Sequence, residues 1–387
     1  MGQTVIAPPV VQTGQYYPYD PVKNPLGQKT WTQYFKNSSP SGSSMSGAPN
    51  SRIIYGNGIY AFIISTGYVF YSTDAKNWNQ QYIGANACYC IAYGNNIWVV
   101  AGYAGVLYSG TPGGTWTART SQFGAGSYIY DVKWIPTVNL FISTGYPTSS
   151  GACAIASSAD GITWTNRFND TNSQGNYYAI DYDPSTTTIA LSCGSSTNNI
   201  YYSTNGTSWT AGSTYGVSGQ TLVFVRGALN KFVNGTSSLF TSNSANIGST
   251  WASQNPTIQF NTPNNNNSFY GGLSTTPNHN YEMQYDSVNN YYYQYVSQSF
   301  YSNDLQNGTM ELITYDASTL LNTAYNSTTN YLQAFPIVKT EVVPLSSSVY
   351  GVGRVAANYA YGYVNGIHII AGYQMGTDSS FQIYTTA

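Results

Sequence analysis

The stretch Ser158-Ala159-Asp160-Gly161-Ile162-Thr163-Trp164 is the best-formed copy of a pattern that recurs along this chain of 387 residues. A full copy leads from a Ser- or Thr-rich strand end through Asp or Asn to Gly and then to Trp, and the other copies keep part of it. They end at Trp78, Trp116, Trp209 and Trp251. Successive tryptophans of this set lie 38, 48, 45 and 42 residues apart. A period of roughly 40 to 50 residues is typical of propeller blades with four strands each.

The sequence between these tryptophans predicts strands rather than helices. Apolar and polar residues alternate with period two, and Gly, Asn and Ser interrupt the alternation about every eight residues. In one unit we expect strands over residues 97–101, 106–109 and 115–119. Asn57-Gly58 stands between two apolar runs and predicts a tight hairpin, because both turn positions need a positive φ that Asn and Gly tolerate.

The two ends of the chain complement each other. Residues 363–372 and 381–386 supply inner strands of a last unit, but the chain stops before any Gly-x-x-Thr-Trp. That missing half stands near the other end, at residues 27–35 around Trp31. We expect the N-terminal strand to complete the C-terminal blade, which removes a free sheet edge.

Outer strands at Trp31, at the five repeat tryptophans and near Met310 give the predicted number of blades. The predicted fold is all-β, a seven-bladed β-propeller of four-stranded antiparallel blades that spans residues 27–387. Residues 1–26 contain five prolines and predict an extended arm. If the chain belongs to a particle, this arm would dock on the other proteins of the particle; otherwise it would lie across its own propeller. Residues 316–350 are expected to be an insertion that forms an extra hairpin or a contact surface.

The repeat resembles the Asp-box, or BNR, motif Ser-x-Asp-x-Gly-x-Thr-Trp of sialidases, secreted glycosidases and photosystem-assembly or sortilin-type propellers. The best match, at residues 158–164, has one residue fewer between Asp160 and Gly161. The resemblance covers most of residues 27–387 and implies architecture only, because one fold hosts many functions. It implies that Asp or Asn accepts backbone N–H bonds in a turn and that Trp packs between blades. The residues with these implied structural roles are Asp74, Trp78, Trp116, Asp160, Trp164, Asn205, Trp209, Trp251, Asp304 and Trp31.

The composition is unusually neutral. Only 7% of the residues are charged, against about 25% in an average soluble domain, while Tyr occurs 39 times. The formal net charge of −2 provides no basic surface for nucleic acid. Neutral β-rich chains of this kind resemble extracellular or virion-surface proteins, including those of tailed phages and of viruses from hot acidic habitats.

The start of the chain lacks the basic residues and apolar core of a signal peptide. No window reaches the ~18 apolar residues of a membrane span, so we expect no membrane insertion. A surface-type composition without a secretion signal favours a virus structural protein that is exported as part of a particle. The predicted location is therefore the virion surface or the extracellular space. A secreted protein whose signal has been removed remains an alternative.

The sequence argues against an enzyme and against a metal or cofactor site. A sialidase-like site needs three Arg, and Arg119 and Arg167 follow blade tryptophans on outer strands. Hydrolase, P-loop and zinc-protease motifs are absent. Cys88-Tyr89-Cys90 has one intervening residue, and His279 and His368 are the only histidines, so no metal site is expected. Cys153 and Cys193 occupy corresponding places in consecutive blades and could form a disulfide.

Tyrosine-rich loops are the predicted binding surface. Tyrosine offers a flat apolar face and a neutral hydroxyl at low entropic cost, which suits sugars. The predicted function is a receptor- or glycan-binding propeller of a viral spike, tail or turret, whose partner is a host surface glycan or receptor. A purely architectural particle subunit and a sialidase-like secreted glycosidase are the alternatives. The candidate ligand-binding residues, which could instead pack between blades, are Tyr103, Tyr128, Tyr146, Tyr177, Tyr178, Tyr215, Tyr270 and Tyr373.

Overall fold

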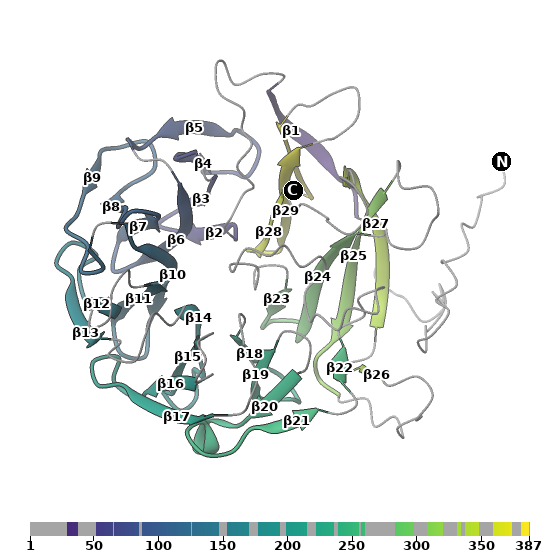
Figure 1. The fold of residues 1–387 in the computed structure, drawn as a ribbon. Helices are drawn as coiled ribbons and strands as arrows, with labels where there is room; N and C mark the ends of the chain where they lie inside the picture. Colours follow the sequence, from purple (N-terminus) through teal and green to yellow (C-terminus); the bar gives the residue numbers. More distant parts are fainter. Residues whose placement is uncertain are drawn as a thin grey trace, which may run out of the picture.

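The computed structural model is a ring of four-stranded antiparallel sheets arranged around a central axis (Figure 1). It describes residues 29–37, 52–64, 66–84, 87–124, 126–146, 153–169, 177–193, 199–214, 222–235, 239–254, 257–259, 283–297, 308–319, 331–333, 337–347, 359–373 and 381–386. Within these ranges the regular structure is all strand, apart from one short 3-10 helix at Ser244–Asn246. None of the described segments forms a helix long and apolar enough to cross a membrane.

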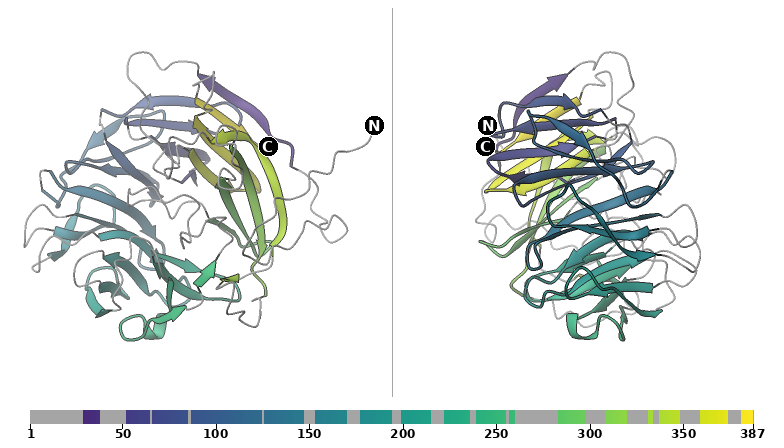
Figure 2. Two further views of the ribbon diagram at one scale, coloured as in Figure 1. Left: turned by 45° about the vertical axis from the view of Figure 1, so that its right-hand side comes forward. Right: turned by 90° about the vertical axis from the view of Figure 1, so that its left-hand side faces the viewer.

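Five consecutive sheets are each built from four strands that follow one another in the chain, and the first strand lies innermost (Figures 1 and 2). The side view of Figure 2 shows these sheets as tilted layers stacked along the ring. Their strands are β2 (Ile54–Gly56), β3 (Ile59–Ile63), β4 (Tyr68–Ser72) and β5 (Asn79–Tyr82); β6 (Cys88–Gly94), β7 (Ile97–Gly102), β8 (Leu107–Gly110) and β9 (Trp116–Ala118); β10 (Tyr128–Ile135), β11 (Leu140–Tyr146), β12 (Cys153–Ser158) and β13 (Thr165–Asn169); β14 (Tyr177–Tyr182), β15 (Ile189–Cys193), β16 (Asn199–Ser203) and β17 (Thr210–Thr214); β18 (Leu222–Val225), β19 (Lys231–Gly235), β20 (Leu239–Ser242) and β21 (Ala252–Gln254).

Two further four-stranded sheets complete the ring. In both, one strand comes from outside a continuous run of the chain. A parallel pair of short strands lies apart from the radial sheets. The strands are β23 (Met283–Asp286), β24 (Tyr291–Ser297), β25 (Gly308–Asp316) and β27 (Ile337–Ser347) in one sheet; β28 (Tyr359–Val364), β29 (Ile367–Tyr373), β30 (Phe381–Thr385) and β1 (Thr32–Asn37) in the other; and β22 (Thr257–Gln259) and β26 (Tyr331–Gln333) in the pair.

The last sheet is closed by the beginning of the chain. β1 pairs antiparallel with β30, and Phe35 stands opposite Ile383. Trp31 directly precedes β1, which is where the sequence predicts the missing outer strand. The edge of β30 is thereby covered by backbone hydrogen bonds instead of lying open to other chains.

The prediction of a seven-bladed propeller is wrong. Six of the seven predicted markers, from Trp31 to Trp251, begin or directly precede an outer strand. Met310 does not, because it lies in β25, the third strand of its sheet, opposite Val343. The outer strand of that sheet is β27, within residues 316–350, which were expected to be an insertion. The regular repeat therefore comprises six Trp-marked blades, and the sector from β23 to β27 follows a different pattern.

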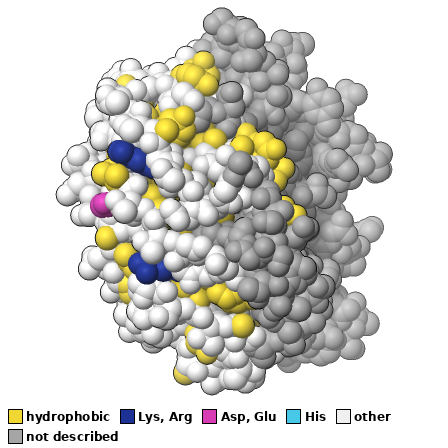
Figure 3. All heavy atoms as spheres, turned by 60° about the vertical axis from the view of Figure 1, so that its left-hand side comes forward, with side chains coloured by type: hydrophobic (Ala, Val, Ile, Leu, Met, Phe, Trp, Pro, Cys, Tyr) yellow, Lys and Arg dark blue, Asp and Glu magenta, His cyan; other side chains and the backbone are white. Residues whose placement is uncertain are grey.

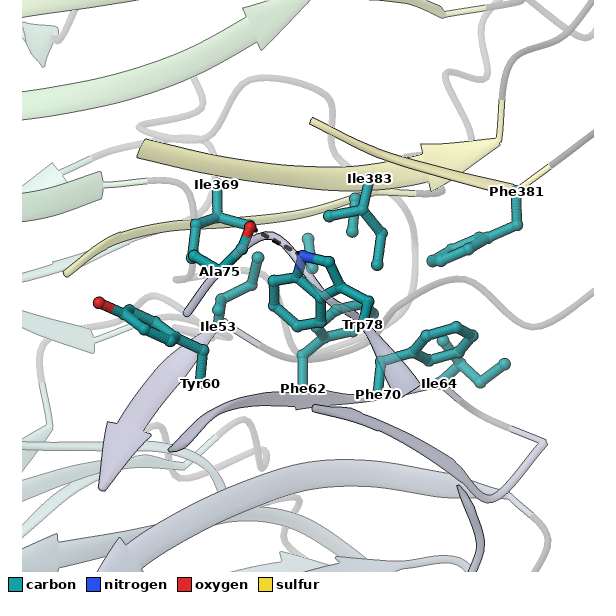
Figure 4. Close-up of a cluster of buried hydrophobic side chains, with 12 residues drawn as sticks. Ile53, Tyr60, Phe62, Ile64, Phe70, Ala75, Trp78, Ile369, Phe381 and Ile383 are labelled. Carbon is teal, nitrogen blue, oxygen red and sulfur yellow. Dashed lines mark hydrogen bonds between the residues drawn. The ribbon is translucent and has the colours of Figure 1, made fainter. Parts of the chain in front are cut away.

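Apolar side chains fill the space between neighbouring sheets. At the junction of the first and last sheets, Phe62, Phe70 and Trp78 pack against Phe381 and Ile383 (Figure 4). Burying each such side chain contributes about 1.5–3 kcal/mol, so this junction is among the features that hold the ring closed.

The hairpin turns have the backbone geometry that their residues predict. Asn57 and Gly58 connect β2 and β3 with φ angles of 48° and 78°. Asn365 and Gly366 do the same between β28 and β29, at 52° and 78°. Both turn residues having positive φ is the feature of a type I′ hairpin, which fits the twist of the strands.

Candidate functional site

The predicted turn residues accept backbone hydrogen bonds between the third and fourth strands of their blades. Asp160 Oδ1 accepts from the backbone N–H of Ile162 at 2.8 Å and of Thr163 at 2.7 Å. Asp74 and Asn205 each accept a corresponding pair of backbone N–H groups at 2.7–2.9 Å. The two backbone N–H bonds that Asp74 accepts hold the pKa of its carboxyl far below the usual range. These three side chains therefore stabilise turns, and Asp304 lies outside the described residues.

The tryptophans that follow these turns lie at the blade edges. The indole N–H of Trp78, Trp164 and Trp251 donates to a carbonyl of its own turn, at 3.0, 3.3 and 2.9 Å. Trp116, Trp209 and Trp31 are half-buried against apolar clusters.

Three of the predicted binding tyrosines meet at one end of the ring axis, where the inner strand β10 begins. Tyr103 follows β7 and forms a backbone bridge with Tyr128, the first residue of β10. Their ring centroids are 4.6 Å apart. Tyr146, the last residue of β11, pairs with Tyr128 and places its ring centroid 6.1 Å from that of Tyr128. Tyr103 is 39% exposed, so this group of rings reaches solvent.

Two tyrosines that the sequence interpretation missed extend this group across three inner strands. Tyr130 on β10 stacks 5.7 Å from Tyr128, and Tyr89 on β6 lies parallel to Tyr128 at 6.3 Å. Tyr130 also contacts the predicted Tyr178 on β14, with centroids 5.3 Å apart. The missed signal was the period of a strand, because residues 128 and 130 share one face. We call the six residues Tyr89, Tyr103, Tyr128, Tyr130, Tyr146 and Tyr178 the tyrosine cluster.

The remaining candidates are not in this cluster. Tyr177 is 1% exposed and packs between sheets against Phe168 and Tyr201. Adjacent strand residues point to opposite faces, which separates it from Tyr178. Tyr373 ends β29 opposite Phe381, and its side chain is not described. Tyr215 and Tyr270 lie outside the described residues.

Three phenols of the tyrosine cluster are uncharged over a wide pH range. Burial, with smaller contributions from neighbouring tyrosines, raises the pKa of Tyr89 to about 12. Burial raises the pKa of Tyr130 and of Tyr178 as well. These three phenol groups therefore stay protonated and offer flat rings and neutral hydroxyls. Charged side chains are also sparse on the face of the molecule shown in Figure 3.

The carboxylates of the inner strands tie neighbouring blades together. Asp131 on β10 accepts from the backbone N–H of Ile180 at 3.1 Å, and Asp181 on β14 accepts from that of Phe224 at 2.7 Å. The other oxygen of Asp181 pairs with Lys133 at 2.9 Å. Both carboxylates therefore have structural partners. Within the described ranges, no three His, Cys, Asp or Glu side chains gather as a metal site would require.

Three of the four cysteines are core residues. Cys88, Cys90 and Cys193 are buried thiols, and burial raises the pKa of Cys88 and of Cys90. A high pKa keeps a thiol protonated and poorly nucleophilic, which fits packing rather than catalysis.

Comparison with solved structures supports the ring architecture. The WD40 β-propeller domain of Doa1 superposes with a TM-score of 0.51 at 9% sequence identity, over 92% of this chain and 97% of that chain. This chain has the β-propeller fold. YCF48 from Cyanidioschyzon merolae gives a TM-score of 0.49 at 12% identity, over 92% of this propeller and 98% of YCF48. No protein family matches the propeller by sequence, and no curated protein does. Identities this low establish the fold alone.

Proposed function

We propose that this propeller is a non-enzymatic binding protein that is exposed on the surface of a viral or phage particle. Its tyrosine cluster binds a neutral glycan of the host. The observation that carries this proposal is the chain of ring contacts from Tyr103 through Tyr128 and Tyr130 to Tyr178. Tyr103, Tyr128 and Tyr130 offer an aromatic surface with neutral hydroxyls at one end of the ring axis, and Tyr178, which is buried, supports it from behind.

The chemistry of the cluster favours a sugar over a charged ligand. An aromatic face attracts the C–H side of a sugar ring, while phenol hydroxyls exchange hydrogen bonds with sugar hydroxyls. Two rotatable bonds per tyrosine keep the entropy lost on binding small. The raised phenol pKa values keep Tyr89 and Tyr130 without charge, so we expect the affinity for a neutral glycan to change little with salt.

The absence of catalysis is part of the proposal. The carboxylates Asp74, Asp160, Asp131 and Asp181 accept backbone N–H bonds, which supports structural roles for them. The repeated turn geometry at Asp74, Asp160 and Asn205 supports assignment of the repeat to the Asp-box class.

The particle context rests on composition. A chain with 7% charged residues and 39 tyrosines resembles surface proteins of virions. In this proposal residues 1–26 attach the propeller to other particle proteins, and the tyrosine cluster faces outward.

A glycan array with the full chain tests the binding proposal. We expect binding to neutral glycans that persists when NaCl is raised from about 0.1 to 1 M, because screening acts on charged contacts. Failure to bind any neutral glycan, together with self-assembly or binding to particle proteins, would instead support an architectural subunit.

A further inference from the structure

A separate cavity of about 450 Å³ lies at the other end of the inner strands that surround the ring axis. The two sites lie at opposite ends of the same inner strand, because Tyr128 begins β10 while Trp134 and Pro136, which line the cavity, stand at its end. Residues of β2, β6, β10, β14, β23 and β28 also line it. Its volume lies within the range of about 300–1,000 Å³ that is usual for small-molecule sites.

The lining of this cavity is cationic. It includes Arg52 and Lys133, and the described lining residues contain no Asp or Glu. Asp181 stands behind Lys133 and accepts from the backbone N–H of Phe224 with its second oxygen. Arg226 lies 5.9 Å above the ring of Tyr182, which is another lining residue. The group holds three cations, Arg52, Lys133 and Arg226, against two carboxylates, Asp131 and Asp181, so one formal positive charge remains and favours an anion.

Rigid aromatic walls flank these cations. A Cβ on Gly56 would lie 2.1 Å from a ring carbon of Tyr93, so the ring lies directly on the glycine backbone. The ring of Trp134 lies on Gly94 in the same way, where a Cβ would come within 2.2 Å. Each ring is thus held against the end of the preceding inner strand. Flat walls of this kind suit a ligand with a planar apolar group.

We propose that this cavity binds a small organic anion whose carboxylate or phosphate pairs with Arg52 and Lys133 while its flat group lies between the aromatic walls. A guanidinium presents paired N–H donors that match the oxygens of a carboxylate or phosphate. This inference goes beyond the proposed function, since it concerns a different class of ligand at the end of the inner strands opposite to the tyrosine cluster.

Calorimetric titration of the full chain with phenyl phosphate, benzoate and benzyl alcohol tests the proposal. We expect at least one of the two anions to bind, and to bind more weakly as NaCl rises from about 0.05 to 0.5 M. Binding of phenyl phosphate alone would identify a phosphate ligand, and binding of benzoate alone a carboxylate. Equal binding of benzyl alcohol, or no binding of either anion at millimolar concentration, would overturn the proposal.

A charge-matched pair of variants locates the binding site. Arg52→Gln is expected to weaken anion binding about tenfold, the equivalent of one lost charge-assisted contact of ~1.4 kcal/mol. Lys76→Gln removes the same charge from the exposed Asp74 turn and should leave the affinity unchanged. Equal affinities of the two variants would contradict the assignment.

A second variant keeps the test decisive if Arg52→Gln does not fold. Tyr55 is a third aromatic residue of the cavity wall, beside Tyr93 and Trp134, and it is 40% exposed, so Tyr55→Ala is expected to fold. It should weaken phenyl phosphate or benzoate more than inorganic phosphate, which has no flat group. An equal effect on all the anions, or no effect on any, would argue against the aromatic walls.

Discussion

Gln33 donates from Nε2 to Oε1 of Gln382 at 2.7 Å, although 349 residues separate the two in the chain. This contact crosses the junction where β1 completes the sheet of β30. Pairing of β1 with β30 covers the edge of β30 and gives the last sheet the same number of strands as the other sheets of the ring.

Phe35→Ala tests this closure. Phe35 lies on β1 and places its ring 5.6 Å from that of Phe70 and 6.3 Å from that of Phe381. We expect the variant to lose about 2 kcal/mol of unfolding free energy, less than for a fully buried Phe because the ring is half-buried. Urea denaturation measures the loss. Lys36→Ala, the exposed neighbour on β1, is the control, and an equal effect of both variants would contradict the packing role.

The prediction of fold from sequence succeeded where local chemistry decides the structure. The Asn57-Gly58 hairpin and the Trp-marked outer strands follow from turn residues and strand alternation, so they could be predicted locally. The sector around Met310 could not be predicted in this way, because β27 does not directly follow β25 in the chain. No turn motif before β27 indicates that it pairs with β25. Pairing of distant strands depends on the whole ring rather than on any local signal.

The tyrosine cluster was predicted only in part, for a similar reason. Tyr103, Tyr128 and Tyr146 were identified as residues near loops, and they meet in space. Tyr89 and Tyr130 were missed, because contacts between inner strands of neighbouring blades depend on how the blades are arranged around the axis. The alternation of residues 128 and 130 could have suggested Tyr130.

Asp160 offers a second test, this time of the turns. Asp160→Ala removes the acceptor of two backbone N–H bonds and should cost about 1 kcal/mol. Asp160→Asn should stay close to the unmodified protein, because Asn205 accepts the same pair of bonds in its own blade. Thermal denaturation of both variants checks this. Equal losses would mean that the carboxylate charge, rather than the acceptor geometry, holds the turn.

The pH dependence of stability provides a third test, at His368. This side chain is 2% exposed, and its Nδ1 lies 2.9 Å from the hydroxyl of Tyr361. Burial, with positive charge from Lys29 and Lys339, holds its pKa well below the ordinary value of 6.5. Around it also stand the rings of Tyr293 and Tyr363.

The direction of this pH effect depends on whether the folded or the unfolded state takes up the proton. The unfolded histidine becomes protonated below about pH 6.5 while the folded one stays neutral, so acidification favours unfolding. We expect the contribution of His368 to the unfolding free energy to be constant above about pH 6.5. Below that pH it should fall by at most ~1.4 kcal/mol per pH unit. In His368→Gln the slope between pH 6.5 and 5 should flatten, whereas His279→Gln should keep it. The assignment fails if the first variant retains the full slope.

The most direct measurement of the proposed function is the affinity of two tyrosine variants for the neutral glycan that binds best on the array. Tyr103 in the tyrosine cluster and Tyr82 on the outer strand β5 are 39% and 48% exposed, so both substitutions should be tolerated. In calorimetric titration we expect Tyr103→Ala to weaken binding about tenfold, the loss of roughly 1.4 kcal/mol of aromatic contact. Tyr82→Ala should bind as the unmodified propeller does. Unchanged affinity in Tyr103→Ala, or an equal loss in both variants, would contradict the assignment of glycan binding to the tyrosine cluster.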